Sequence, residues 1–467
     1  MSSHPSKTPH MSLAEDDRPS FSRIWIRESL RESFKSKLVQ NATWMLSGQG
    51  LQLLGRMVYF IIVAHVLGPR EYGSFVACTA FIGVLSPFAS CGTGHVMIKY
   101  VARDRSNLPT YLGNALLVTA TSAAALTLCA LVLRPHVLPS SAGSAMLLAV
   151  ALADLLGMES TTVCQQVFLA LEQGRRFSHL IGFSTGIRLL AALVLVAWGG
   201  TATHWAYLYS ASALITMAAA IVVVSRCCAR PRFKSKLFMP SVREGVHFAT
   251  ALASQSVYND IDKTMLARLH SVEAAAIYAA AYRFIEAAIL PIRSVANAAY
   301  PDFFRHGASG VTSSFAFAKK ILRRSSLYGL GIAFALFAAA GVIPLVLGRA
   351  YVESAPALRW LSLLPFMKCV HIFFSDTLTG ANYQWQTSSA QIVVAAFNVL
   401  INLWIIRAYG WKGAAWSSLA TDGLLALSLF AIIQWHVRRE RRSADRQRAE
   451  ALETQRRDSL QGWVSHP

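Results

Sequence analysis

The chain has 467 residues, of which 54% are hydrophobic and only 15% are charged, and its mean hydropathy is +0.41. An average soluble domain carries about 25% charged residues, so this composition argues against a soluble enzyme, a nucleic-acid-binding protein and a disordered scaffold. Lys and Arg (44) outnumber Asp and Glu (24), which gives a formal net charge of +20. In a membrane protein such an excess gathers in cytoplasmic loops. The seven cysteines form no Cys-x-x-Cys pair, so we predict neither a metal site nor a disulfide framework.

The first 40 residues are polar and charged, and we expect them to form a cytoplasmic segment without a cleavable signal peptide. Between residues 21 and 38, aromatic and aliphatic side chains alternate with cations. This pattern is typical either of an amphipathic helix lying in the membrane interface or of a solvated helix, and the sequence does not decide between them.

The rest of the chain is dominated by long apolar stretches. A helix needs about 20 mainly apolar residues to cross the hydrocarbon core of a bilayer. Windows of that length predict about twelve transmembrane helices near residues 43–67, 74–98, 112–133, 144–170, 178–198, 203–225, 246–267, 274–300, 326–348, 357–380, 387–408 and 412–435. We therefore predict an all-α integral membrane protein.

The predicted loops alternate between strongly and weakly basic, and the strongly basic ones are expected to be cytoplasmic. This places both termini in the cytoplasm. A long basic loop at 226–245 would link two six-helix halves, 41–225 and 246–436, and 437–467 would form a basic cytoplasmic tail that begins as a helix. Related halves commonly enclose the substrate site of secondary transporters, so we expect a central cavity between them.

Five short motifs follow one another along the chain. They are Leu67-Gly68-Pro69-Arg70-Glu71-Tyr72-Gly73, Lys99-Tyr100-Val101-Ala102-Arg103-Asp104, Asp262-Lys263, Ile277-Tyr278-Ala279-Ala280-Ala281-Tyr282-Arg283 and Tyr409-Gly410-Trp411-Lys412-Gly413-Ala414-Ala415. Together they resemble the polysaccharide exporters and O-antigen (Wzx-type) flippases of the multidrug/oligosaccharidyl-lipid/polysaccharide (MOP, MATE-like) exporter superfamily. The resemblance covers roughly residues 40–436. The chain departs from the family pattern at the turn residues His270-Ser271 and at Ala276.

The resemblance implies a transporter rather than an enzyme, located in the inner (plasma) membrane of a bacterium. Such a flippase moves a polyprenyl-diphosphate-linked oligosaccharide from the cytoplasmic to the periplasmic leaflet by alternating access, for O-antigen, capsule or exopolysaccharide synthesis. Its expected partners are the lipid-linked glycan, membrane lipids, and possible glycan polymerase and export machinery, and no nucleic acid is expected.

Charged residues inside the predicted spans give the candidate site. Each costs about 2.5–3.5 kcal/mol on insertion scales, so such residues usually face the bundle interior and mark a pathway. Helical spacing puts them on single faces of their spans. The candidate substrate-binding cations are Arg56, Lys263, Arg283, Arg293 and Lys368. The polar or ion-coupling candidates are Gln52, Asn259, Asp260, Asp262 and Glu286. This excess of cations favours an anionic substrate such as a diphosphate.

Each candidate also has a purely structural interpretation. Arg283 and Glu286 either contact substrate or form a buried pair at i, i+3, and Lys263 either contacts substrate or neutralises a neighbouring aspartate. Arg293 either lines the cavity or extends its charged end to the headgroups. Arg56 has no acid in its own helix and is the strongest candidate for phosphate contact. Charged residues of lower priority lie in three other spans. Asp154, Glu159 and Arg188 could form an interhelical group, and Asp422 has no visible partner in the sequence.

Three other functions compete with a flippase. An ion-coupled multidrug or organic-cation antiporter of the same superfamily would favour acids over bases in the cavity. A membrane enzyme such as a glycan polymerase is typically built around a long periplasmic loop, and every such loop is short here. A membrane scaffold would have no use for charges at mid-membrane depth. The sequence carries no nucleotide-binding P-loop, so transport would draw on an ion gradient or on product removal, and no cofactor is expected.

Overall fold

The structure is a computed structural model that describes residues 37–464. Within this range every regular element is a helix, and no strand occurs. The predicted all-helical membrane fold is therefore confirmed. Residues 1–36, which hold most of the predicted N-terminal amphipathic segment, lie outside the described residues.

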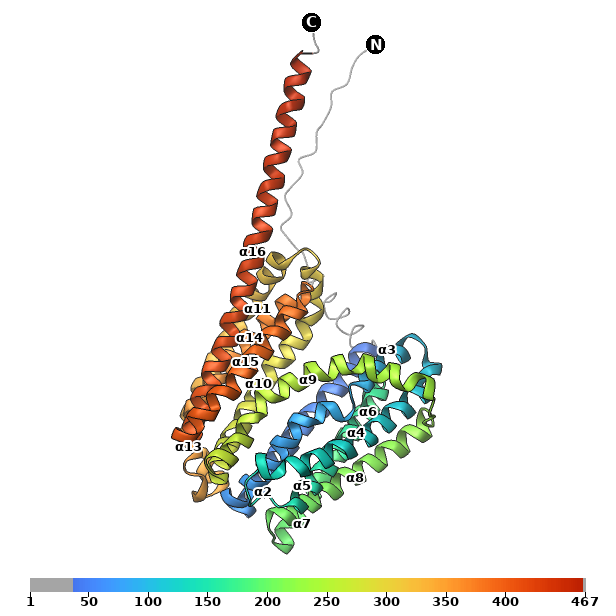
Figure 1. Cartoon of the computed structure of the whole chain (residues 1–467), viewed down its shortest axis with the longest axis vertical. Coiled ribbons are helices and arrows are strands. Elements are labelled where there is room, and N and C mark those ends of the chain that lie inside the picture. The colour runs from blue at the N-terminus through green and yellow to red at the C-terminus, as the bar shows by residue number, and fades with distance from the viewer. Residues whose placement is uncertain (1–36, 465–467) are drawn as a thin grey trace, which may run out of the picture.

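The helices form two groups, which Figure 1 shows side by side. The first group comprises α2 (Lys37–Ala89), α3 (Thr93–Arg103), the 3-10 helix η1 (Arg105–Asn107), α4 (Leu108–Val137), α5 (Ser144–Ala151), the π-helix η2 (Leu152–Met158), α6 (Glu159–Ala170), α7 (Gly174–Trp198) and α8 (Ala202–Cys227). The second group comprises α9 (Ser235–Leu269), α10 (Val272–Gly307), α11 (Val311–Ala339), α12 (Val342–Leu347), the 3-10 helix η3 (Arg349–Tyr351), α13 (Ser354–Leu361), α14 (Leu364–Gly380), α15 (Gln384–Tyr409) and α16 (Trp411–Val464).

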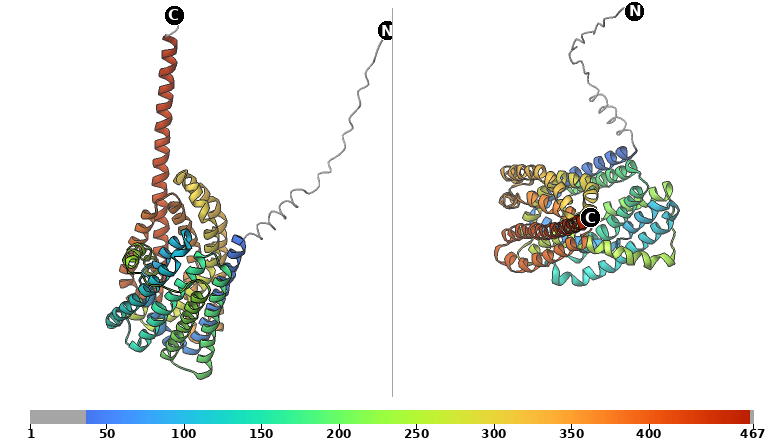
Figure 2. Two further views of the ribbon diagram at one scale, coloured as in Figure 1. Left: turned by 90° about the vertical axis from the view of Figure 1, so that its right-hand side faces the viewer. Right: turned by 90° about the horizontal axis from the view of Figure 1, so that it is seen from above.

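The two groups form a V, meeting at the lower end of Figure 1 and separating toward the upper end. The helix α9, which begins within the predicted linker, crosses between them and packs against α2, α3 and α4 as well as α10 and α15. At the upper end α16 projects far beyond the other helices, as Figure 1 and the left view of Figure 2 show. We call the lower end the closed end and the upper end the open end.

The packing of the interior matches this shape. One large cluster of buried apolar side chains joins both groups and includes Phe75 of α2, Trp205 of α8 and Tyr278 of α10. The Tyr351 hydroxyl donates a buried hydrogen bond to the carbonyl of Ala64 across the two groups, at 3.1 Å. Two smaller clusters are each confined to one group. The groups therefore share a core on one side and have separate cores elsewhere.

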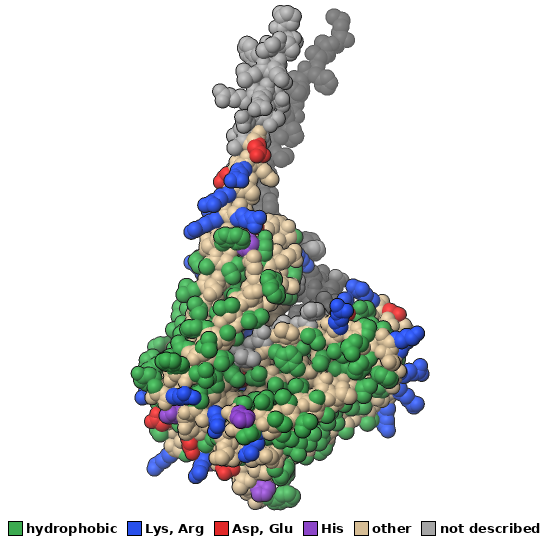
Figure 3. Space-filling view, viewed as in Figure 1, with side chains coloured by type: hydrophobic (Ala, Val, Ile, Leu, Met, Phe, Trp, Pro, Cys, Tyr) green, Lys and Arg blue, Asp and Glu red, His purple; other side chains and the backbone are tan. Residues whose placement is uncertain are grey.

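The outer surface is apolar, as a lipid-facing protein requires. Large hydrophobic side chains such as Leu128, Phe334 and Trp404 are 65%, 75% and 82% exposed. In Figure 3 hydrophobic side chains cover much of the visible face of both groups, while Lys and Arg gather toward the two ends. Since apolar surface of this extent would be unfavourable in water, the fold is that of a multi-pass membrane protein.

Ten helical segments of the described chain are long and apolar enough to span a membrane, against about twelve predicted. Two features account for the difference. The segment Thr43–Ala89, at 47 residues, is far longer than one span and contains the first and most of the second predicted span. The helix α9 has 35 residues and is long enough to span a membrane. It is not among the ten apolar segments because it contains many polar residues.

The connection between the first two predicted spans lies where the sequence predicts it, at Gly68. This residue has φ 68° and ψ 174°, which is not helical, so it divides α2 into two helices that meet at a kink. A positive φ is readily adopted by glycine, and the following Pro69 removes a backbone donor. The predicted second span also ends early, because Cys91 and Gly92 adopt positive φ and separate α2 from α3.

Candidate functional site

A cavity of about 420 Å³ lies between the two groups of helices. We call it the central cavity. All five cations singled out in the sequence line it, namely Arg56, Lys263, Arg283, Arg293 and Lys368. They come from α2, α9, α10 and α14, so the cavity is built by both groups. Among the described residues that line it, two are carboxylates, Asp260 and Glu286. The lining therefore carries a formal net charge of +3, from five cations and two acids.

Helical periodicity explains why these side chains converge. On α10, Arg283, Glu286 and Arg293 are spaced at i, i+3 and i+10, which places them on one face of the helix. On α9, Asp260 and Lys263 are spaced at i, i+3. Each helix therefore turns one polar stripe toward the cavity, and its other faces remain apolar for packing and lipid contact.

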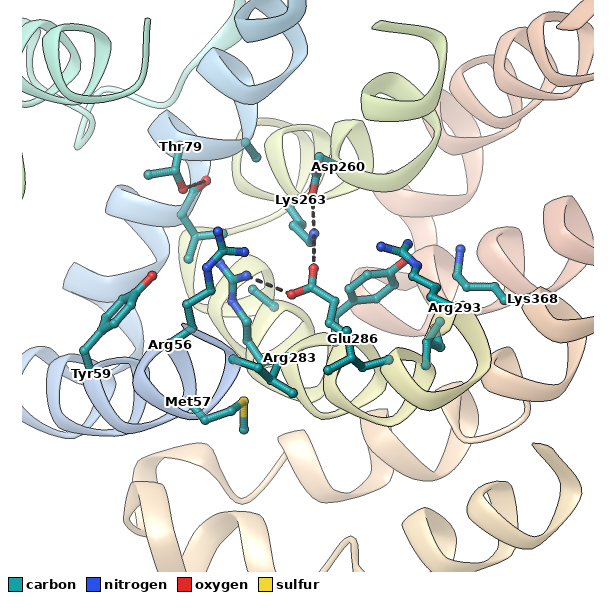
Figure 4. Close-up of a pocket in the computed structure, with 17 residues that line it drawn as sticks. Arg56, Met57, Tyr59, Thr79, Asp260, Lys263, Arg283, Glu286, Arg293 and Lys368 are labelled. Carbon is teal, nitrogen blue, oxygen red and sulfur yellow. Dashed lines mark hydrogen bonds and ion pairs between the residues drawn. The ribbon is translucent and has the colours of Figure 1, made fainter. Parts of the chain in front are cut away.

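An ion-pair network crosses the cavity from α9 to α10, and Figure 4 shows its members. The Lys263 ammonium lies 2.5 Å from a carboxylate oxygen of Asp260 and 4.0 Å from one of Glu286. Glu286 also accepts a hydrogen bond from the Arg283 guanidinium at 2.9 Å. The ammonium of Lys263 further lies 4.4 Å from the centre of the Tyr282 ring, in cation–π geometry. Two of the five cations thus have acidic partners within the cavity.

Arg56 and Arg293 are different, because neither forms a salt bridge with any of the described residues. Both side chains belong to exposed residues that line the cavity. In Figure 4 Arg56 lies on one side of Glu286, with Arg283, and Arg293 lies on the other, with Lys368. These two guanidinium groups therefore leave their fork of donors available to an anion.

The fifth cation, Lys368, is paired behind the cavity wall. Its ammonium lies 3.5 Å from a carboxylate oxygen of Asp422 on α16, and His371 Nε2 lies 3.0 Å from the other oxygen. Lys368 is 4% exposed and Asp422 is 2% exposed. No partner for Asp422 could be predicted from the sequence, because Lys368 and His371 lie on a different helix about fifty positions earlier in the chain.

The polar candidates are placed differently from one another. Asp262 is 4% exposed and does not line the central cavity. It accepts hydrogen bonds from the Tyr278 hydroxyl at 2.5 Å and from the backbone N–H of Lys263 at 2.8 Å, so it packs α9 against α10. Gln52 lines a second cavity. The side chain of Asn259 lies outside those that the structure describes.

The second cavity, of about 290 Å³, is built mainly by the first group of helices, and we call it the side cavity. It brings together the three residues that the sequence ranked low, Asp154, Glu159 and Arg188. Arg56 and Arg283 line both cavities. The sequence analysis considered these three residues as a possible interhelical group, but it did not predict the cavity that they line together. Among the described residues no group of three His, Cys, Asp or Glu side chains is arranged to hold a metal ion.

The fold is similar to that of solved transporters of the MOP superfamily. An inward-facing multidrug resistance MATE family transporter superposes with a TM-score of 0.70 at 14% identity, covering 84% of this chain and 96% of that one. An outward-facing structure of such a transporter gives 0.60 at 13% identity, with coverage of 87% and 96%. A MOP superfamily transporter from Pyrococcus furiosus, described as having a binding pocket of reverse polarity that suggests a different function, gives 0.62 at 14% identity, with coverage of 85% and 95%.

A family model described as "Polysaccharide biosynthesis protein" matches residues 38–306, which is more than half of the chain and includes four of the five cavity cations. No curated protein sequence is significantly similar to this chain. Both the family and the fold are those of membrane transporters rather than of enzymes. The chain therefore belongs to the polysaccharide biosynthesis protein family and has the transporter fold of the MOP superfamily.

Proposed function

We propose that this protein is a flippase that exports a polyprenyl-diphosphate-linked oligosaccharide across the bacterial inner membrane for surface polysaccharide synthesis. One observation carries the proposal: five cationic side chains from both groups of helices converge on one cavity, whose described lining includes two carboxylates. A diphosphate leaving water needs charged hydrogen-bond donors to replace its hydration, and guanidinium groups supply them in bidentate form.

The dimensions of the cavity and the shape of the fold agree with this substrate. A volume of about 420 Å³ lies within the range of sites for small ligands. The two groups of helices separate toward the open end, while the apolar outer surface lies against lipid. The diphosphate and sugars would enter the cavity from this end, and the polyprenyl tail would stay in the bilayer. The basic residues of α16 at the open end support its cytoplasmic orientation.

An organic-cation antiporter of the same superfamily is the competing proposal. A cationic drug would meet a lining with net positive charge in the central cavity, where Arg56 and Arg293 form no salt bridge. Placing a second cation there is unfavourable in a medium of low dielectric constant. The charge of the cavity therefore favours an anionic substrate.

A deletion strain tests the proposal. We expect loss of surface glycan and accumulation of lipid-diphosphate-linked repeat units on the cytoplasmic face of the inner membrane. Wild-type protein should restore the glycan, whereas Arg56→Ala at equal protein level should not, because losing a charged hydrogen bond weakens binding by about tenfold or more. Arg323→Ala is the matched control, since Arg323 is exposed on α11 and lines neither cavity.

Intact surface glycan without accumulated lipid-linked units in the deletion strain would contradict the flippase proposal, once a redundant flippase has been excluded genetically. Efflux of organic cations by the purified protein would then favour the antiporter. Rescue of the deletion strain by Arg56→Ala at normal levels would contradict the role of the central cavity without touching the flippase activity itself.

A further inference from the structure

The side cavity adjoins the central cavity but has a different chemical character. The two cavities share three lining residues, Arg56, Tyr59 and Arg283. The other polar groups of the side cavity are carboxylates, hydroxyls and an amide, together with one further arginine, Arg188. A ligand that occupies the central cavity at Arg56 therefore has a second polar compartment directly beside it.

The π-helix η2 explains how two carboxylates reach this cavity. Asp154 and Glu159 are five residues apart, and in a regular α-helix five residues correspond to a rotation of about 140°, which puts them on different faces. A π-helix closes i→i+5 hydrogen bonds, so residues five apart are brought closer to the same side of the helix than in an α-helix. Asp154 lies within η2 (Leu152–Met158), and Glu159 follows it directly. Both side chains line the side cavity as a result.

Arg188 on α7 is the most unusual group in this cavity. It is 8% exposed, and its guanidinium carbon lies 3.8 Å from the centre of the Tyr209 ring. The Tyr209 hydroxyl in turn donates to Asp154 at 2.7 Å. Among the described residues the Nε atom of Arg188 has no hydrogen-bond partner. A buried donor without an acceptor is unfavourable. Because Arg188 lines the side cavity, a ligand there that brings an acceptor atom to this arginine would be favoured.

The mixture of charges restricts the class of that ligand. A second phosphate would be repelled by Asp154 and Glu159, and an organic cation would be repelled by Arg188, Arg56 and Arg283. A neutral molecule with several hydroxyl groups suits both signs. Its O–H groups can donate to the carboxylates, and its oxygens can accept from the arginine. The faces of aromatic rings such as that of Tyr59 can cover its C–H groups.

We propose that the side cavity binds the first, neutral sugar of the lipid-linked glycan while the central cavity holds the diphosphate. This inference rests on the proposed flippase function. The sugar is bonded directly to the diphosphate, so a diphosphate held at Arg56, which lines both cavities, leaves the sugar at the wall that the two cavities share. The side cavity would thus recognise the glycan, and the central cavity would recognise the diphosphate of the lipid carrier.

The experiment compares two probes on the purified full-length protein in nanodiscs. One is undecaprenyl diphosphate, and the other is undecaprenyl diphosphate carrying a single N-acetylglucosamine. Kd values are measured for wild type, Asp154→Asn, Glu159→Gln and Arg293→Gln. Asp302→Asn, on an exposed ion pair of α10, is the matched control for an acid-to-amide change. Thermal unfolding of each variant establishes that it is folded.

Wild type should bind the sugar-bearing lipid about tenfold more tightly than the bare lipid. Asp154→Asn and Glu159→Gln should each weaken only the sugar-bearing lipid, by about threefold to tenfold, as expected for one hydrogen bond to a ligand. Arg293→Gln should weaken both lipids, and Asp302→Asn neither.

Two results would overturn the inference and leave the flippase proposal intact. One is equal affinity of wild type for both lipids, and the other is an unchanged sugar preference in both side-cavity variants. Binding of sodium that depends on Asp154 and Glu159, without any sugar preference, would assign the cavity to a cation instead. Absence of binding of either lipid to wild type would overturn both the inference and the proposed function.

Discussion

Five cations line the central cavity, but they differ in what surrounds them. Lys263 and Arg283 face carboxylates within the cavity, and Lys368 faces one behind its wall. Arg56 and Arg293 form no salt bridge with any described residue. In the proposed function, the paired cations would orient the network and the other two would supply charge to an incoming anion. Of these two, the sequence favoured Arg56, which has no acid on its own helix.

The buried group formed by Lys368, His371 and Asp422 should contribute to the stability of the protein. Asp422→Ala removes the carboxylate that pairs with the buried ammonium of Lys368 and should lower the free energy of unfolding by about 3–5 kcal/mol. The double variant Lys368→Met/Asp422→Leu removes both charges. It should recover most of the stability that Asp422→Ala loses. Chemical unfolding of the purified variants in detergent measures both values. Equal losses in the single and double variants would show that the pair does not act as a unit.

At the scale of helices, the closed end depends on a close contact between α2 and α10. A Cβ atom built on Gly73 would lie 1.8 Å from the carbonyl oxygen of Val272 and 3.3 Å from the Cβ of Ala276. The first distance is far below van der Waals contact, so no larger residue fits unless the helices separate. The absence of a side chain at Gly73 is therefore what allows the two groups to meet here.

We expect Gly73→Ala to lower the thermal stability of the protein and to reduce complementation of the deletion strain, because it forces the closed end apart. Gly50→Ala is the control on the same helix, since a Cβ there meets nothing within 4 Å. A helical glycine replaced by alanine without a clash is neutral or stabilising by about 0.4–1 kcal/mol. Equal stability of the two variants would show that the α2–α10 contact tolerates the extra atom.

A second contact between helices depends on pH. The Lys99 ammonium on α3 lies 2.6 Å from Glu244 on α9, and the Tyr100 hydroxyl donates to the same carboxylate at 3.2 Å. The hydrogen bond from Lys99, with that from Tyr100, holds the pKa of Glu244 below its ordinary value. These contacts stabilise the ionised carboxylate and so add to the stability of the folded protein. Their contribution is complete above the ordinary pKa of about 4.3 and is lost as the pH falls below it.

Glu244→Gln should therefore be less stable than wild type at neutral pH, and the difference should vanish in acid, below about pH 4. Because the pair is partly exposed, the difference should be small, about 0.2–1 kcal/mol. Thermal unfolding of both proteins between pH 7 and pH 3 measures it. A constant difference across this range would show that Glu244 acts by packing rather than by charge.

For the molecule as a whole, hydropathy was sufficient to predict an all-helical membrane protein, and helical spacing was sufficient to predict which charges converge. Arg56 and Arg293 follow from periodicity, because residues of one helical face point the same way. The pairing of Lys368 with Asp422 did not follow, since it depends on how two distant helices pack. The side cavity did not follow either, because a change from α to π hydrogen bonding leaves no mark in an apolar sequence.

The two groups of helices share a core at the closed end and have separate cores elsewhere. Such a shape suits two rigid bodies that rock about the site between them, as alternating access requires. The cations of the central cavity come from both groups. A diphosphate held there would therefore contact both moving parts and bind across the interface at which they rearrange.

Transport by the purified protein in liposomes would test the proposed flippase activity directly. Undecaprenyl diphosphate carrying a fluorescent disaccharide is placed in the bilayer, and a membrane-impermeant glycosidase reports which leaflet displays the sugar. We predict that wild-type protein makes the inner-leaflet pool accessible, that Arg56→Ala with Arg293→Ala abolishes this, and that Arg323→Ala does not. Sugar that stays protected in wild-type liposomes as fully as in protein-free ones would contradict the central claim.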